Sequence, residues 1–177
     1  MTVKRSRPIV VRRAPGNPRQ ARVQLAHGVV RAALGRGGIR ALKREGDDGT
    51  PRGRLPIRLV LYRHDRIPRP RTPAALRAIR ENDGWCDDPK DANYNRRVRL
   101  PRERNAEGLA RADDLYDLVA VLGYNDRRRL RGRGSAIFLH LAREGFTPTE
   151  GCLGLNRRDM LRLLAELRRG THILIIA

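Results

Sequence analysis

The chain has 177 residues, enough for one domain with a sizeable hydrophobic core, and we expect residues 1–177 to form a single domain whose residues 1–7 are flexible. Its 39 lysines and arginines, of which 36 are arginine, outnumber 19 acidic residues. The formal net charge of +20 suits a polyanionic partner, such as a nucleic acid or an anionic cell-wall polymer. No apolar run could span a bilayer, and the basic N-terminus lacks the apolar segment of a secretory signal.

The first third of the chain predicts short strands separated by turns. Residues 8–13 and 57–62 have the β-branched and apolar composition of strands, and residues 21–33 have the pattern of a hairpin. Segment 43–53 is polar and rich in glycine, but it lacks the spacing of a phosphate-binding loop. We therefore expect it to be a connecting loop.

The middle of the chain is charged and has no clear periodicity. Residues 76–81 are consistent with a helical turn, and residues 84–95 with a loop that contains Trp85, the only tryptophan. This side chain either lines a pocket or packs on the core as a plug. Residues 96–111 carry so many charges that we expect them to be exposed, with part of the segment helical.

The last third has the strongest patterns. A helix is predicted over residues 157–169, because Asn156 can cap it, leucines recur on one face and Gly170 can end it. Three strands are predicted, at residues 115–122, 135–140 and 171–176.

These elements together predict a mainly β fold. Several short strands are separated by turns, one good helix lies in the C-terminal half, and strands and helices do not alternate. The pattern favours a β-sandwich or flattened barrel of mixed sheets.

Cys152 and His140 are the best candidates for a reactive pair. A thiolate is the nucleophilic form of cysteine, and a neighbouring imidazole can take the thiol proton and return it to a leaving amine. Gly151 lets the chain turn tightly, so that backbone N–H groups can point at a developing oxyanion. Cys86 lies beside two aspartates and is not favoured as the nucleophile. The four histidines are dispersed and no CxxC pattern is present, so we expect no metal site.

Three stretches give the sequence a resemblance to the L,D-transpeptidase catalytic domain family of bacterial cell-wall enzymes. The first is the connector 43–53, which is similar to the family's Lys–Gly–Asp…Thr-Pro-x-Gly segment. The second is the apolar strand that ends in His140, and the third is Thr149-Glu150-Gly151-Cys152, similar to the family's Ser/Thr-x-Gly-Cys element. Their order and spacing spread the resemblance over residues 8–177.

The resemblance implies acyl transfer on peptidoglycan stem peptides. The family's cysteine attacks the amide between the diamino acid at stem position three and the terminal D-alanine, and an amine of another stem resolves the thioester into a cross-link. By position, Cys152 is the nucleophile, His140 the base and acid, and the N–H groups near Gly151 and Cys152 bind the oxyanion. No metal or organic cofactor is implied.

The chain departs from the family pattern at three positions near this pair. Glu150 stands where many members have histidine, Gly154 where many have arginine, and Leu141 where glycine is frequent. The missing arginine is a natural carboxylate anchor, for which Arg131 or Arg133 could substitute by position. Glu150 should raise the pKa of the thiol unless a cation offsets it. The candidate substrate-binding residues are Tyr124, Arg133, Ser135, Glu150 and Trp85.

Two other functions are compatible with the sequence. The same site could hydrolyse similar peptides, as an L,D-carboxypeptidase or amidase, because the acyl-enzyme is common to both reactions. The net charge also allows an arginine-rich nucleic-acid-binding module in which Cys152 is dispensable. The family implies the periplasm or cell envelope, but no signal peptide is visible, so a cytoplasmic role stays open.

Overall fold

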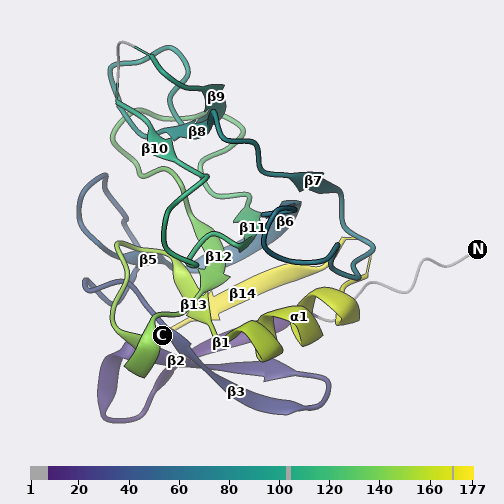
Figure 1. Ribbon diagram of the computed structural model, residues 1–177. Coiled ribbons are helices and arrows are strands. Elements are labelled where there is room, and N and C mark those ends of the chain that lie inside the picture. The colour runs from purple at the N-terminus through teal and green to yellow at the C-terminus, as the bar shows by residue number, and fades with distance from the viewer. Residues whose placement is uncertain (1–7, 103–104, 169) are drawn as a thin grey trace, which may run out of the picture.

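A closed β-barrel forms the body of the protein in the computed structural model (Figure 1). The structure describes residues 8–102, 105–168 and 170–177, so the expected flexibility of residues 1–7 lies outside the described residues. In order around the barrel the strands are β11 (Leu118–Leu122), β12 (Phe138–Leu141), β13 (Leu153–Leu155), β3 (Gly28–Ala33), β2 (Asn17–Leu25), β1 (Ile9–Ala14), β14 (His172–Ile176) and β6 (Gly53–Tyr62).

Strand β6 closes this barrel because it is long enough to pair with two neighbours. Its residues 53–56 pair with β14, and its residues 57–62 pair with β11. The pairs β1–β14 and β12–β13 are parallel and the other barrel pairs are antiparallel, so the predicted mainly β fold of mixed strands is confirmed. Because β6 pairs with β11, the barrel has no open edge between them, whereas a sandwich would have one.

A single α-helix among the described residues packs on the barrel core. Helix α1 (Arg157–Glu166) begins at Asn156, whose side-chain oxygen accepts from the Asp159 N–H at 2.8 Å, as predicted. Its buried Met160, Leu163 and Leu164 belong to the same cluster as the inward side chains of the strands. The predicted end at Gly170 is wrong, because the backbone leaves the helical region at Leu167, whose side chain turns into the core.

The middle of the chain contains short strands where helical structure was expected. The expected helical turn at 76–81 contains β7 (Leu76–Ala78), which pairs in parallel with β6, and side-chain exposure alternates along it as in a strand. The expected helix within 96–111 is also wrong for the described residues of that segment, 96–102 and 105–111, which contain two short strands and no helix. The remaining elements are β4 (Ile39–Arg40), β5 (Thr50–Pro51), β8 (Asp83–Cys86), β9 (Arg96–Arg99), β10 (Glu107–Gly108) and a 3-10 turn at Glu144–Phe146.

Strands β8, β9 and β10 form a second, small sheet in the order β10-β8-β9, and it lies above the barrel in Figure 1. The sequence predicts a loop where β8 lies and an exposed, partly helical segment where β9 and β10 lie, because these residues have little apolar alternation. Arg97 on β9 is held by the buried Asp83 on β8 through an ion pair of 2.5 Å, so charge pairing supports a strand that apolar burial would not.

A second apolar cluster fills the space between the small sheet and the barrel. Strand β11 serves both cores. Its Leu118, Ala120 and Leu122 pack in the barrel cluster, whereas Val119 and Val121 pack in the second cluster. This double burial explains why β11 has an uninterrupted apolar sequence. The second cluster also contains Phe138 and Cys152, so the candidate site lies at this junction.

The helix cap gives a stability test of the fold. Asn156→Ala removes the acceptor for the Asp159 N–H and should lower the free energy of unfolding by about 1 kcal/mol in urea denaturation. Asn156→Ser retains an acceptor for this N–H without adding a carboxylate beside Asp159, and it should lose less stability than the alanine variant. Equal losses in both variants would contradict the capping role.

Candidate active site

Two adjacent parallel strands bring His140 and Cys152 to the same face of the barrel wall. Leu139 pairs with Leu153 and His140 with Gly154, so Cys152, immediately before β13, lies beside Phe138. The Phe138 N–H contacts the Cys152 Sγ at 3.4 Å. Because side chains alternate along a strand, Phe138 and His140 point away from the barrel core, on the same side as Cys152.

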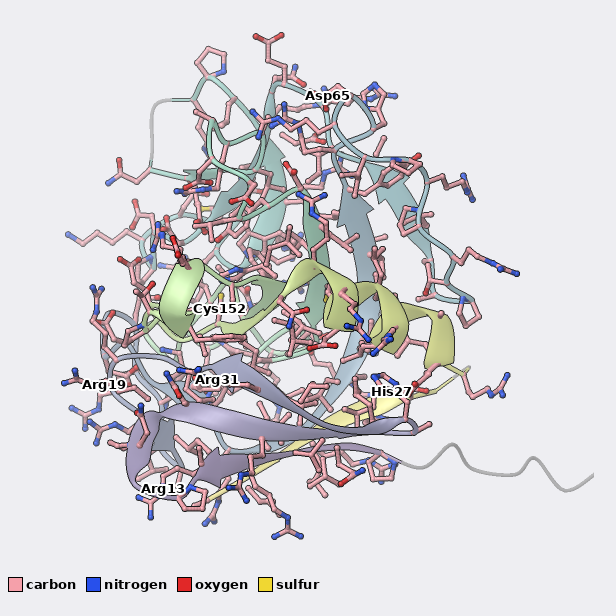
Figure 2. The ribbon with its side chains drawn as sticks, turned by 60° about the horizontal axis from the view of Figure 1, so that its bottom comes forward. Arg13, Arg19, His27, Arg31, Asp65 and Cys152 are labelled. Atoms are coloured by element: carbon pink, nitrogen blue, oxygen red, sulfur yellow. The ribbon has the colours of Figure 1, made fainter. Side chains whose placement is uncertain are left out.

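A cavity of about 230 Å³ opens between this wall and the small sheet, and both His140 and Cys152 line it. Each residue is nevertheless buried, with exposed fractions of 6% and 9%. The rest of the wall is mainly charged, with arginines and carboxylates interspersed. It includes Arg36, Arg111, Arg143, Asp87, Glu107 and Glu150. Figure 2 shows Cys152 behind the 3-10 turn, next to the ribbon of β13.

The Cys152 thiol is protonated in this environment. Its Sγ donates to the Ala136 carbonyl at 3.2 Å. Burial raises the pKa of the thiol to about 12, and the Glu107 carboxylate adds to the rise, while the Phe138 N–H and the Lys43 ammonium oppose it. The expected effect of Glu150 is the smallest of these, since its exposed side chain is paired with Arg36 at 3.1 Å.

The His140 imidazole is neutral and is held in one tautomer. Its Nδ1 lies 2.7 Å from the Leu141 carbonyl oxygen, and because a carbonyl only accepts, Nδ1 carries the proton and Nε2 keeps the lone pair. Burial lowers the pKa of His140 to about 4. The Tyr116 ring packs edge-on against the imidazole, with centroids 5.4 Å apart. The resting pair is therefore an uncharged thiol and an uncharged base.

The turn before the cysteine requires glycine. Thr149 Oγ1 accepts from the Gly151 N–H at 3.3 Å and donates to the Cys152 carbonyl at 2.7 Å. Gly151 has a φ of 122°, and a Cβ there would lie 2.8 Å from the Gly49 carbonyl oxygen. The turn is thus pressed directly against the connector 43–53.

The connector 43–53 does more than join two strands, because its charged side chains lie next to the catalytic cavity and the turn at Gly151. Lys43 is 3% exposed and its Nζ donates to Asp47 at 2.7 Å. Its ammonium would lie 3.5 Å from a Cβ at Gly151, which places a positive charge close to this turn. Glu45 lines the cavity and accepts from Ser135 Oγ at 2.9 Å.

The structure separates the candidate substrate-binding residues into two groups. Ser135 and Glu150 line the cavity that contains Cys152. Trp85 and Tyr124 line a different cavity, and the Trp85 ring packs edge-on against Phe138, with centroids 5.1 Å apart. Arg133 lines neither of these two cavities, and its carbonyl accepts from the Tyr124 hydroxyl at 2.8 Å.

A polar group that sequence reasoning missed faces the pair from the small sheet. Tyr116 donates its hydroxyl to Glu107 at 2.6 Å, and the Arg111 guanidinium lies 5.2 Å from the Tyr116 ring centre. Burial raises the pKa of Glu107. Glu107 lies in a charged stretch with no distinguishing pattern, so its sequence held no signal that it would turn toward Cys152.

A steric constraint explains why position 154 is glycine. A Cβ there would lie 3.2 Å from the Ala142 Cα and 3.2 Å from the Ala33 Cβ, so any side chain at this position would require its neighbours to shift by a few tenths of an ångström. The cavity has other guanidinium groups. Arg111 is bonded to Asp113 through two contacts of 2.7 Å, whereas the exposed Arg143 has only a 3.9 Å contact with Asp113. Arg143 is therefore the more available of the two.

Comparison with known proteins gives one match. The family model described as the L,D-transpeptidase catalytic domain matches residues 16–175. Searches of curated proteins and of solved structures found no match. Within the described ranges, no helix is long and apolar enough to cross a membrane, and no group of three or more His, Cys, Asp or Glu side chains could hold a metal ion.

The uncharged pair predicts a distinctive pH profile. In a Cys86→Ala protein, whose only thiol is Cys152, the rate of alkylation by iodoacetamide should rise about tenfold per pH unit between about pH 7 and pH 9, because the thiolate fraction grows far below a pKa of about 12. Mass spectrometry of quenched samples measures the rate. A plateau in this range would instead indicate a preformed thiolate–imidazolium pair.

Proposed function

This chain belongs to the L,D-transpeptidase catalytic domain family, and on that premise we propose that it transfers acyl groups between peptidoglycan stem peptides through a thioester on Cys152. The single observation that supports this most strongly is the placement of a thiol and a tautomer-fixed imidazole on one face, both lining one cavity. The family suggests a cell-envelope location and peptidoglycan substrates.

In the first half-reaction, Sγ attacks the carbonyl carbon of the amide between the position-three diamino acid and the terminal D-alanine. The thiol turns from the Ala136 carbonyl toward His140, whose Nε2 takes its proton as the C–S bond forms. The same proton then passes to the leaving nitrogen as the C–N bond breaks. D-Alanine departs, and the acyl group remains on Cys152.

In the second half-reaction, an amine of another stem attacks the thioester. His140 takes one proton from that amine and returns it to the departing sulfur, so the thiol is restored and a cross-link between two position-three residues remains. The Cys152 N–H would receive the oxyanion in both steps, and the Gly151 N–H would join it on leaving Thr149 Oγ1. The Lys43 ammonium near Gly151 would add to the stabilisation. Lys43 is a positioning and electrostatic residue in this scheme.

Burial of the pair suits a mechanism in which charge appears only during attack. Neither the thiolate nor the imidazolium is present beforehand, so their separation must be stabilised by fixed dipoles at the moment of reaction. The Leu141 carbonyl serves that purpose for the imidazolium, because its hydrogen bond with Nδ1 strengthens when the ring becomes positive.

The direct test uses a purified tetrapeptide stem as donor and an amine-bearing stem as acceptor. The expected products, followed by mass spectrometry, are free D-alanine and a cross-linked dimer, and Cys152→Ala should form neither. Cys86→Ala is the matched control and should retain activity, since Cys86 does not line the catalytic cavity. Free D-alanine with a shortened monomer and no dimer would identify hydrolysis, and turnover by Cys152→Ala would refute the proposal.

Arg143 is the proposed anchor for a substrate carboxylate. Arg143→Gln should reduce kcat/KM roughly tenfold to a hundredfold, because a charge-assisted hydrogen bond contributes about 1.5–3 kcal/mol. Arg143→Lys should recover part of the loss, because it keeps the charge but not the planar fork. Arg133→Gln is the control and should change little, because Arg133 does not line this cavity. The opposite ranking of the two glutamine variants would remove Arg143 from the site.

A further inference from the structure

A second hollow lies along the opposite edge of the small sheet from the catalytic cavity. It consists of two cavities of about 870 and 450 Å³ that share Arg77 and Arg97, and we call it the arginine trough. Neither cavity shares a lining residue with the cavity of Cys152. Strand β9 lines the trough, whereas Glu107 of β10 lines the catalytic cavity, and β8 lies between these strands (Figure 1).

The charge of the trough is strongly one-sided. The larger cavity is lined by five arginines and one carboxylate, Asp83, which is already bonded to Arg97. Arg77 and Arg80 are exposed, and neither has an ion-pair partner among the described residues. The catalytic cavity, in contrast, is lined by both signs of charge in similar numbers. Of these two hollows, the trough is therefore the one with an excess of guanidinium groups over carboxylates.

Two buried donors in the trough also have no acceptor. Arg102 Nε in the larger cavity and Arg129 Nε in the smaller one are inaccessible to solvent and have no hydrogen-bond partner among the described residues. A buried polar group without a partner costs about 1–3 kcal/mol. Neither Nε is accessible to solvent, so a ligand in the trough would not reach these two atoms, and the Arg102 guanidinium is already bonded to the buried Asp91. The exposed Arg77, Arg80 and Arg99 are therefore the guanidinium groups that the trough offers to a ligand.

The chemistry of these groups favours phosphate. Guanidinium is planar and bonds phosphate oxygens through paired donors, and a row of such groups suits a chain with a phosphate at each repeat. Bases of a single-stranded nucleic acid need aromatic side chains on which to stack. The larger cavity is lined by no aromatic side chain. Of the two in the smaller cavity, Trp85 packs against Phe138 and Tyr124 donates its hydroxyl to the Arg133 carbonyl.

We propose that the arginine trough binds a phosphodiester-linked polyol or sugar polymer, through its phosphates and apart from the site of acyl transfer. The ligand lies along β9 and supplies anionic oxygens to Arg77, Arg80 and Arg99. The proposal does not depend on the acyl-transfer activity, since it rests on residues that the catalytic cavity does not contain.

The test compares two double variants that remove the same charge. Arg77→Gln/Arg80→Gln alters the trough, and Arg13→Gln/Arg19→Gln alters exposed arginines on the β1–β2 side of the barrel, labelled in Figure 2. The probe is poly(glycerol phosphate) of defined length, and binding is measured by titration calorimetry at several salt concentrations. A single-stranded thymidine oligonucleotide with the same number of phosphates is the comparison ligand.

The trough variant should bind the polymer at least about tenfold more weakly, with the slope of log affinity against log salt reduced by about 1.5 in total. The control variant should lose less than about twofold. Both variants should keep the parent circular dichroism and the parent rate of Cys152 alkylation by iodoacetamide. Equal losses in both variants, no binding of the polymer by the parent, or tighter binding of the oligonucleotide would each overturn the proposal.

Discussion

The candidate site depends on the register between two short parallel strands. Leu139 and Leu141 must enter the barrel core, and this requirement turns Phe138 and His140 outward. The pairing of His140 with Gly154 then leaves Cys152 beside Phe138 on the same outer face. A slip of one residue would bury the imidazole in the barrel and expose a leucine, so the apolar core and the reactive pair are fixed by one constraint.

Burial has opposite consequences for stability and for reactivity at this junction. The small sheet and the Tyr116 ring exclude water from His140 and Cys152. This exclusion keeps both groups uncharged and makes the thiol harder to ionise. The same exclusion strengthens each dipole that the site holds in place. Gly151 shows the structural requirement most clearly, because its turn is compressed against Gly49 while the buried Lys43–Asp47 pair supports the connector from below.

The sequence predicted the elements whose apolar side chains pack in the barrel core. It did not predict the elements that are stabilised by ion pairs in place of apolar burial. The strand at 115–122 and the cap at Asn156 have local signals, and the structure has both. Strand β9 is three arginines and a valine, stabilised by pairing with β8 and by Asp83, so no periodicity could reveal it. For the same reason, the sequence could not predict that Glu107 approaches the site, because the position of Glu107 is set by the pairing of β10 with β8.

The small sheet accounts for how one very basic chain can present two electrostatic environments. Its β10 edge faces a cavity where arginines and carboxylates alternate, which suits stem peptides that carry both amines and carboxylates. Its β9 edge faces a hollow lined by guanidinium groups in excess. At physiological salt, exposed charges are screened over about 8 Å, so the two edges influence their ligands largely independently. The charged side chains that contribute to the pKa shifts of His140 and Cys152 include Arg143, Arg111, Glu107 and Lys43, and none of these four lines the trough. The protonation states of the reactive pair are therefore set by the groups around the catalytic cavity.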